Sequence, residues 1–364
     1  MRRLRQADAD MTQGVIWRQL LDFAVPMALG LLFQQLYNTV DTIVVGQFVG
    51  KEALAAVGSV GSVVNMLVGL CAGLSTGASV IISQCYGAHD NARLHDAVHT
   101  TIALTFLLCI AATVVGLAMV PLMLDLMATP ADVIELSREY LNIYFAGITG
   151  LLIYNMGSGI LRAVGDSRRP LYFLCVSALT NIVLDLVFVV AFEWGVAGVA
   201  YATIISQFAS AVLVLIVLTR SDTAYGIKWR QIRIRRGMHG RSMAIGFPSG
   251  IQQAITSFSN VFVQSYINYF GSACMAGWSS YNKLDSYITV PLQAIALAST
   301  TFVGQNYGSN NLERTRKGVN QALGMSLVVT AALGVLVMIF SRPCLRLFTA
   351  DAEVMEYGTR FIMI

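Results

Sequence analysis

Residues 83–88, Ser-Gln-Cys-Tyr-Gly-Ala, return at residues 304–309 as Gly-Gln-Asn-Tyr-Gly-Ser, an offset of 221. An offset of 221 or 222 aligns further positions of the two halves. The matched pairs are Pro26 with Pro248, Phe48 with Phe270, Arg93 with Arg314, Val133 with Val354 and Glu135 with Glu356. An offset that holds over about a hundred residues indicates an internal duplication.

The composition excludes an ordinary soluble protein. Of the 364 residues, 56% are apolar and 12% are charged, against about 25% charged in soluble domains. The mean hydropathy is +0.65. These values also exclude disordered and collagen-like chains. They leave a transporter, a channel and a membrane enzyme open.

Charged residues are so widely spaced that they leave long apolar stretches. A membrane helix needs about 20 such residues, and nine stretches are long enough. They lie at about 20–46, 54–86, 94–120, 139–161, 171–192, 197–219, 242–269, 275–306 and 318–341. A tenth span begins near Arg360, just before the chain ends. We expect Pro26, Pro248 and Pro291 to kink their helices.

The distribution of Lys and Arg predicts the orientation. With a cytoplasmic N-terminus, 18 of these residues fall inside and five fall outside, and Lys283 lies within a span. Such a bias supports a cytoplasmic N-terminus. The basic start of the chain is not followed by the short apolar core of a cleaved signal peptide. We therefore expect a multi-pass protein of the bacterial inner (cytoplasmic) membrane.

The repeat also predicts how the spans are organised. Six helices separate the two copies, so both copies have the same orientation and are related by an axis along the membrane normal. Because Ile364 corresponds to Ile143, the second half lacks a counterpart to about 144–220. We expect an incomplete copy of a twelve-helix protein. A natural short form is the alternative.

Two carboxylates interrupt predicted spans. Asp41 lies in the outer part of the first span, and Asp185 lies inside the fifth. A charge at the centre of a membrane helix costs on the order of 2.5–3.5 kcal/mol, and such residues usually face a cavity and serve a function. Removal from water also favours the protonated carboxyl, which can then exchange a proton. The alternative is a pair of structural acids that hold helices together.

Polar side chains accompany both acids on shared helix faces. They are Gln34, Tyr37 and Asn38 before Asp41, Asn181 before Asp185, and Thr203 with Gln207 in the sixth span. Their oxygens suit Na⁺ or a proton relay and lack the nitrogen and sulfur donors of structural zinc sites. The repeat places Asp41 on Val263, so this polar set belongs to the first half alone.

The second half contains two charged residues within a predicted span, and two roles are possible for them. Lys283 and Asp285 lie two positions apart in the eighth span and do not face each other well on a helix. They either line a cavity or find partners on other helices. The side chains we expect to line a substrate cavity are Gln34, Tyr37, Asn38, Asn155, Gln207, Gln252, Lys283 and Asp285.

The segment 220–241 is basic and joins the halves. Juxtamembrane basic residues usually contact anionic lipid head groups, so we expect no nucleic-acid partner. The sequence contains no H-E-x-x-H and no Walker-type loop. It therefore predicts neither an enzyme nor an ATP-driven pump.

Several motifs together resemble the multidrug and toxic compound extrusion family, and within it the DinF-like branch. They are residues 41–46, the Tyr-Gly pairs at 86–87 and 307–308, residues 161–166 with Pro170, Asn181 with Asp185, and residues 195–203. The resemblance covers essentially the whole chain. It implies an all-α polytopic membrane protein with two parallel-repeat six-helix bundles in a V-shaped MATE/MOP-type fold, the second bundle being incomplete here.

The resemblance also implies a site and an activity. Asp41, Asn181, Asp185 and Thr203 would form an H⁺ or Na⁺ site that drives export of organic, often cationic, compounds. NorM-type members carry an acid in the seventh helix, where this chain has Gln252 and Gln253, and this favours the DinF-like branch. The expected units are a first bundle at 1–219, a basic linker at 220–241 and a second bundle at 242–364.

Two other functions compete with the antiporter. A flippase for lipid-linked oligosaccharides would need several cationic side chains around a pyrophosphate, and only Lys283 lies within the spans. A membrane enzyme would need a nucleophile–base pair or a metal cluster, and neither occurs there. We expect a monomer in the lipid bilayer that binds a small molecule and uses no cofactor beyond the coupling ion.

Overall fold

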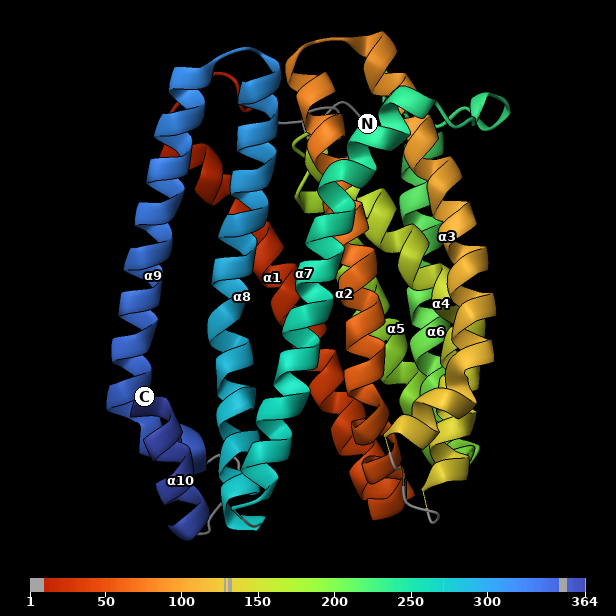
Figure 1. Cartoon of the computed structure of the whole chain (residues 1–364), viewed down its shortest axis with the longest axis vertical. Helices are drawn as coiled ribbons and strands as arrows, with labels where there is room; N and C mark the ends of the chain where they lie inside the picture. The colour runs from red at the N-terminus through yellow and green to blue at the C-terminus, as the bar shows by residue number, and fades with distance from the viewer. Residues whose placement is uncertain (1–9, 128, 130–132, 271, 347–351, 364) are drawn as a thin grey trace.

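The computed structural model describes residues 10–127, 129, 133–270, 272–346 and 352–363, and these residues form ten α-helices and no strand (Figure 1). The helices are α1 (Ile16–Val44), α2 (Lys51–Gly87), α3 (Asn91–Leu126), α4 (Ile134–Ala163), α5 (Arg168–Asp185), α6 (Gly195–Thr219), α7 (Arg236–Asn268), α8 (Ser272–Gly308), α9 (Leu312–Arg346) and α10 (Ala352–Met363). Short π-helical segments follow α1 and α5, and a 3₁₀ turn, η4 (Trp229–Gln231), lies between α6 and α7. Residues 1–9, with three of the arginines used to predict the orientation, lie outside the described residues.

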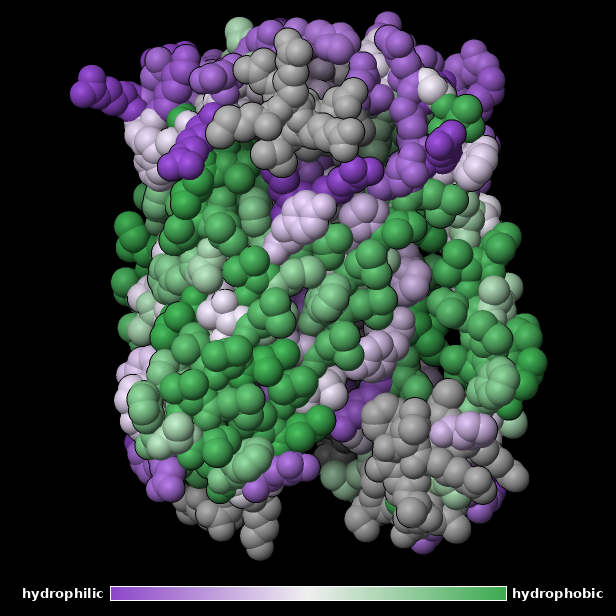
Figure 2. Space-filling model, turned by 180° about the vertical axis from the view of Figure 1, so that it is seen from behind, coloured by the Kyte–Doolittle hydropathy of each residue, from purple (hydrophilic) through white to green (hydrophobic). Residues whose placement is uncertain are grey.

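The outer surface of the molecule is that of a membrane protein. Eight of the described helices are long and apolar enough to span a bilayer. Large apolar side chains point outward, including Leu327 on α9 and Leu179 on α5. On the face drawn in Figure 2, apolar residues form a belt between two more hydrophilic ends. Helices suit this environment because their backbone hydrogen bonds are satisfied internally.

Two details differ from the prediction, and a third concerns the prolines, whose predicted kinks stay a prediction. The expected span at 242–269 is a 33-residue helix, α7, but it is not among the eight apolar helices, because its middle carries residues such as Gln252, Gln253 and Thr256. The last helix begins at Ala352 and not near Arg360. α1, α7 and α8 continue through their prolines, whereas the helical dihedrals break at Phe340 in α9.

The helices pack in an order that follows the repeat. α1 packs between α5 and α8, and α2 packs between α4 and α7 (Figure 1). Since α7 and α8 are the second copies of α1 and α2, the α1–α8 and α2–α7 contacts are equivalent. Along the α2–α7 seam Gly73 lies against Gly250, and Gly77 lies against Gly246. Small residues four apart allow such close approach of two membrane helices.

The duplicated Tyr-Gly motif forms a crossing between α2 and α8. A Cβ atom on Gly87 would collide with the Gln305 carbonyl, and one on Gly308 would collide with the Gln84 carbonyl. The repeat offset of 221 places Gly87 on Gly308 and Gln84 on Gln305, so the two contacts are equivalent. Only glycine permits a backbone to approach another backbone this closely. The crossing lies at the end of the molecule that carries residues 220–235, which we call the linker end (Figure 1).

The chain before α1 is also held at the linker end. The Met11 amide donates to Gln305 Oε1 at 2.9 Å, and Asn306 Nδ2 donates to the Met11 carbonyl at 3.1 Å. The Arg314 guanidinium donates to the carbonyls of Met11 and Gly14, at 3.2 and 2.8 Å for its Nη atoms. Gln305 and Asn306 are fully buried. These bonds join the start of the chain to α8 and α9.

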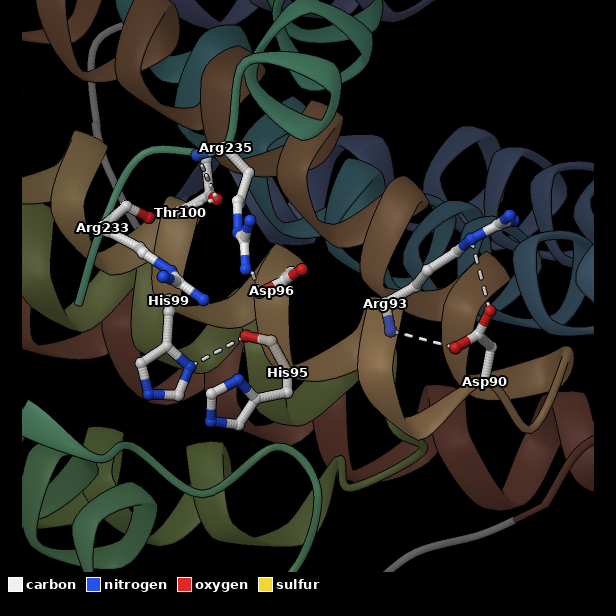
Figure 3. Close-up of polar contacts among 8 residues, drawn as sticks. All are labelled: Asp90, Arg93, His95, Asp96, His99, Thr100, Arg233 and Arg235. Carbon is white, nitrogen blue, oxygen red and sulfur yellow. Dashed lines mark hydrogen bonds and ion pairs between the residues drawn. The ribbon is translucent and has the colours of Figure 1, made fainter. Parts of the chain in front are cut away.

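The linker docks on α3 through the contacts drawn in Figure 3 and one further backbone bond. The buried His99 ring accepts a hydrogen bond from the Lys228 amide at 3.0 Å and donates from Nδ1 to the His95 carbonyl at 2.8 Å. Arg235 pairs with Asp96 at 3.3 Å. Because one ring nitrogen donates and the other accepts, the imidazole is neutral. The linker is therefore part of the fold.

We expect Gly87→Ala to force α2 and α8 apart. Overpacking of this kind costs about 1–3 kcal/mol, and backbone atoms cannot rotate away as a side chain can. In a cysteine-free background, spin labels at the exposed positions Ala88 and Asn310 should report a longer distance. Gly324→Ala is the control, because a Cβ atom there would meet no neighbouring helix within 4 Å. An unchanged label distance for Gly87→Ala would contradict a tight crossing.

We expect His99→Leu to release the linker from α3. The substitution removes the part-buried hydrogen bond from the Lys228 amide, and a hydrogen bond of this kind contributes about 0.5–1.5 kcal/mol. Trypsin should then cleave after Arg230 and Arg233 faster than in the unchanged protein. His89→Asn, a change at an exposed position with positive φ, should leave the cleavage rate unchanged. Equal rates for both variants would show that His99 does not hold the linker.

Candidate functional site

The two membrane acids stand at equivalent places in their helices. Asp41 lies in the last turn of α1, before the π-helical segment η2 (Val45–Val49). Asp185 is the last residue of α5, before the π-helical segment η3 (Leu186–Ala191). The two π segments contact each other. Single π turns inside helices occur frequently at functional sites, and nothing in the sequences of η2 and η3 predicts them.

The fold brings three of the predicted residues together. The Asp41 carboxyl lies within interaction range of both Asp185 and Asn181. Asn181 and Asp185 are fully buried. The i, i+4 spacing on α5 places both on the face that packs against α1.

This acid cluster (Asp41, Asn181 and Asp185) is short of hydrogen-bond partners. The buried atoms without one are Oδ1 of Asp41, both carboxylate oxygens of Asp185, and both amide atoms of Asn181. More than nine in ten buried polar groups in proteins have a partner. Four unpartnered oxygens around one point are hard donors that a proton or Na⁺ would satisfy.

Tyrosines surround the acid cluster. Tyr37 on α1 and Tyr140 on α4 both lie within electrostatic range of Asp41. The rings of Tyr140 and Tyr144 lie 6.1 Å apart and are nearly parallel, and Tyr144 neighbours Gln207 on α6. Tyr140 and Tyr144 were not among the predicted site residues. Their i, i+4 spacing in a predicted span was the available signal.

The remaining first-half candidates are placed less directly. Thr203 is buried on α6, and its hydroxyl donates to the Val199 carbonyl at 3.0 Å. Gln34 neighbours Tyr37, whereas Asn38 is exposed. The Asn155 amide donates to its own helix, at Leu151. Of these residues, only Gln34 is connected to the acid cluster by the described contacts, through Tyr37.

The second-half candidates lie apart from the acid cluster. Gln252 on α7 and Lys283 on α8 are exposed. Asp285 lines a cavity of about 140 Å³ that also borders Tyr281, Met338 and Ile362. This cavity lies between α8, α9 and α10. The role of Lys283 and Asp285 in a substrate cavity stays a prediction. Among the described residues, no group of three or more His, Cys, Asp or Glu side chains could hold a metal ion.

The missing partners predict a measurable effect on stability. Asp185→Asn removes one of two facing carboxylates. Because an unsatisfied buried charge destabilises the folded protein by at least about 1–3 kcal/mol, we expect the substitution to raise the free energy of unfolding. The midpoint of thermal unfolding in detergent, in sodium-free and mildly alkaline buffer, should rise. Asp125→Asn, at an exposed site on α3, should not change it. A lower midpoint for Asp185→Asn would favour the structural role.

Comparisons with known proteins agree on one family. A family model described as MatE matches residues 26–187 and 248–364. The probable multidrug resistance protein YoeA of Bacillus subtilis (strain 168) is 30% identical over 356 residues, which are 96% of this chain and 77% of YoeA. YpnP, a second probable multidrug resistance protein of that organism, is 30% identical over 97% of this chain and 79% of its own length.

A solved structure matches this chain in fold and, at a comparable level, in sequence. An outward-facing multidrug resistance MATE family transporter of the MOP superfamily superposes with a TM-score of 0.90 and 28% identity, covering 98% of this chain and 79% of that protein. Fold, spans and motifs therefore point the same way, and the chain belongs to the MatE family, the multidrug and toxic compound extrusion transporters.

Proposed function

We propose that this transporter is a secondary antiporter that exports organic, often cationic, compounds in exchange for H⁺ or Na⁺. The observation that carries the proposal is the acid cluster, with its buried oxygens that lack hydrogen-bond partners. A relative named a multidrug resistance protein supports the substrate class. A site that binds a coupling cation is expected to contain buried oxygens that have no hydrogen-bond partner within the protein.

The chemistry of the acid cluster explains how a cation could drive transport. Asp41 faces Asp185 in an apolar layer, so two negative charges there repel each other strongly. One proton or one Na⁺ removes that repulsion and bridges α1 to α5. A ligand that binds one conformation better than another shifts the population toward it. Cation binding would thereby change the affinity for the exported compound, and the compound would change cation affinity equally.

The position of the acid cluster fits alternating access. Asp41 stands 25 residues after the start of α1, roughly 35 Å along the helix. The tight α2–α8 crossing lies at the opposite, linker end. We propose that the linker end is cytoplasmic and closed in this structure, as in the outward-facing relative. The cation site is then on the side from which the coupling ion enters.

We expect Asp41→Asn and Asp185→Asn each to abolish export. Ethidium efflux from cells expressing either variant should fall to the level of cells without the transporter. Asp125→Asn at equal expression should retain efflux. Varying Na⁺ and pH separately would then identify the coupling ion.

Two outcomes would contradict the proposal. Efflux by Asp185→Asn at the unchanged rate would show that the acid cluster does not couple transport. Failure of the unchanged protein to export ethidium, together with translocation of a labelled pyrophosphate-linked lipid, would favour the flippase. That second activity should not require Asp41.

A further inference from the structure

The two segments that lead into α1 and α7 are equivalent under the repeat, and each is fastened to a helix of the other half. The offset of 222 places residues 11–14 on residues 233–236. The first segment accepts hydrogen bonds from Arg314 at the start of α9. The second is bonded to Thr100 and Asp96 at the start of α3. Both connections lie at the linker end, where they join the two halves of the chain.

Among the described contacts, only the second connection uses a group that titrates near neutral pH. The His99 ring accepts from the Lys228 amide at 3.0 Å and donates to the His95 carbonyl at 2.8 Å. The repeat places His99 on Asn320, whose side chain does not titrate. The segment before α1 is held by amides and by the Arg314 guanidinium, which keep their charge across the physiological pH range. A response to pH therefore belongs to the linker.

A protonated His99 is incompatible with the docked linker. An imidazolium donates from both ring nitrogens, so its Nε2 proton would point at the N–H of Lys228. The ring is 1% exposed, and a buried charge without a partner is costly. Its other nitrogen is already bonded to the His95 carbonyl. A proton and the linker therefore compete for the same nitrogen atom of His99.

The charges around His99 add repulsion to this competition. The His95 ring stacks on the His99 ring, with centroids 3.9 Å apart. Asp96 is already paired with Arg235. The parts of α2, α4 and α6 that share a core with this end of α3 contribute mainly apolar side chains. The titratable and charged groups that α3, the linker and the start of α7 bring to this region are His95, Asp96, Lys228, Arg233, Arg235 and His239. An imidazolium at position 99 would thus meet several cations and one carboxylate that is already paired.

We propose that protonation of His99 releases the linker from α3, so that acidification on the side of the linker end loosens the closed end of the transporter. The inference rests on the proposed function, because it takes the linker end as the cytoplasmic, closed end. Docking needs the neutral ring, so it is complete above the pKa of a free imidazole, about 6.5, and weakens below it. Lowering the pH from about 7.5 to about 5.5 should raise the population of released linker about tenfold.

Limited proteolysis of the purified protein in detergent tests the release. Trypsin cleaves after Arg230 and Arg233, which are exposed in the linker. The cleavage rate is divided by the rate of trypsin on a small peptide at the same pH, which removes the pH dependence of the protease. The corrected rate should rise about tenfold between the two pH values. His99→Gln keeps an oxygen that can accept from Lys228 and carries no titratable group, so its corrected rate should not change.

A second variant shows which histidine titrates. His95→Gln with His239→Gln removes the other two histidines of this region and should retain the tenfold rise. A rise lost in this variant, or a rise of equal size in His99→Gln, would overturn the assignment to His99. If His99→Gln fails to fold, the double variant still tests the proposal, because a corrected rate that does not depend on pH would contradict it.

The effect on closure is measured separately. In a cysteine-free background, spin labels at the exposed positions Ala88 and Asn310 should report a longer distance at the lower pH. The acid cluster is intact in His99→Gln, so an unchanged distance in that variant would assign the opening to His99 and not to the carboxylates. Faster cleavage without a change in distance would show that the linker does not hold the end closed. Neither measurement involves transport, so failure of the antiporter proposal would be seen only in the efflux of the Asp41 and Asp185 variants.

Discussion

The structure depends on a contact between two backbones at the linker end. Gly87 lies against the Gln305 carbonyl, and Gly308 lies against the Gln84 carbonyl. The two contacts are equivalent, because the internal repeat places Gly87 on Gly308 and Gln84 on Gln305. In a bilayer, helices gain little from burying apolar surface against each other, so close packing has a larger part in holding them together. The glycines make that packing possible where α2 crosses α8, and Gln305 beside them organises the start of the chain.

Much of this fold could be predicted because membrane physics leaves few choices. Apolar length indicates the helices, and the repeat offset indicates their pairing and the glycine motif. The polarity of α7 escapes the prediction because uncharged residues such as Gln252 and Thr256 do not interrupt a search for charges. The start of α10 escapes the prediction for the opposite reason. Glu356 is charged, so a search for uncharged stretches does not include the first turns of a helix that begins at Ala352.

The site was partly predictable for similar reasons. A carboxylate in an apolar span is costly, so Asp41 and Asp185 were evident from the sequence, and helical spacing added Asn181. The meeting of α1 with α5, and the tyrosines that α4 brings to the same place, depend on tertiary packing. The two copies of the duplicated motif also differ in their partners: Gln305 binds the main chain of Met11, whereas Arg235, in the segment that corresponds to residues 11–14, is bonded to Thr100 and Asp96 on α3.

The bonds to Met11 have a consequence for the order of assembly. Met11 and Gln305 are 294 positions apart in sequence, and contacts of such long range form late because the chain between them must first be ordered. During synthesis, Met11 and the start of α1 exist well before α8 and Arg314 emerge from the ribosome. The linker end therefore stays unsealed while seven helices enter the membrane, and it closes only when the eighth arrives. Closure marks the completion of α8, so a chain interrupted before that point would present an unsealed end that cellular quality control could recognise.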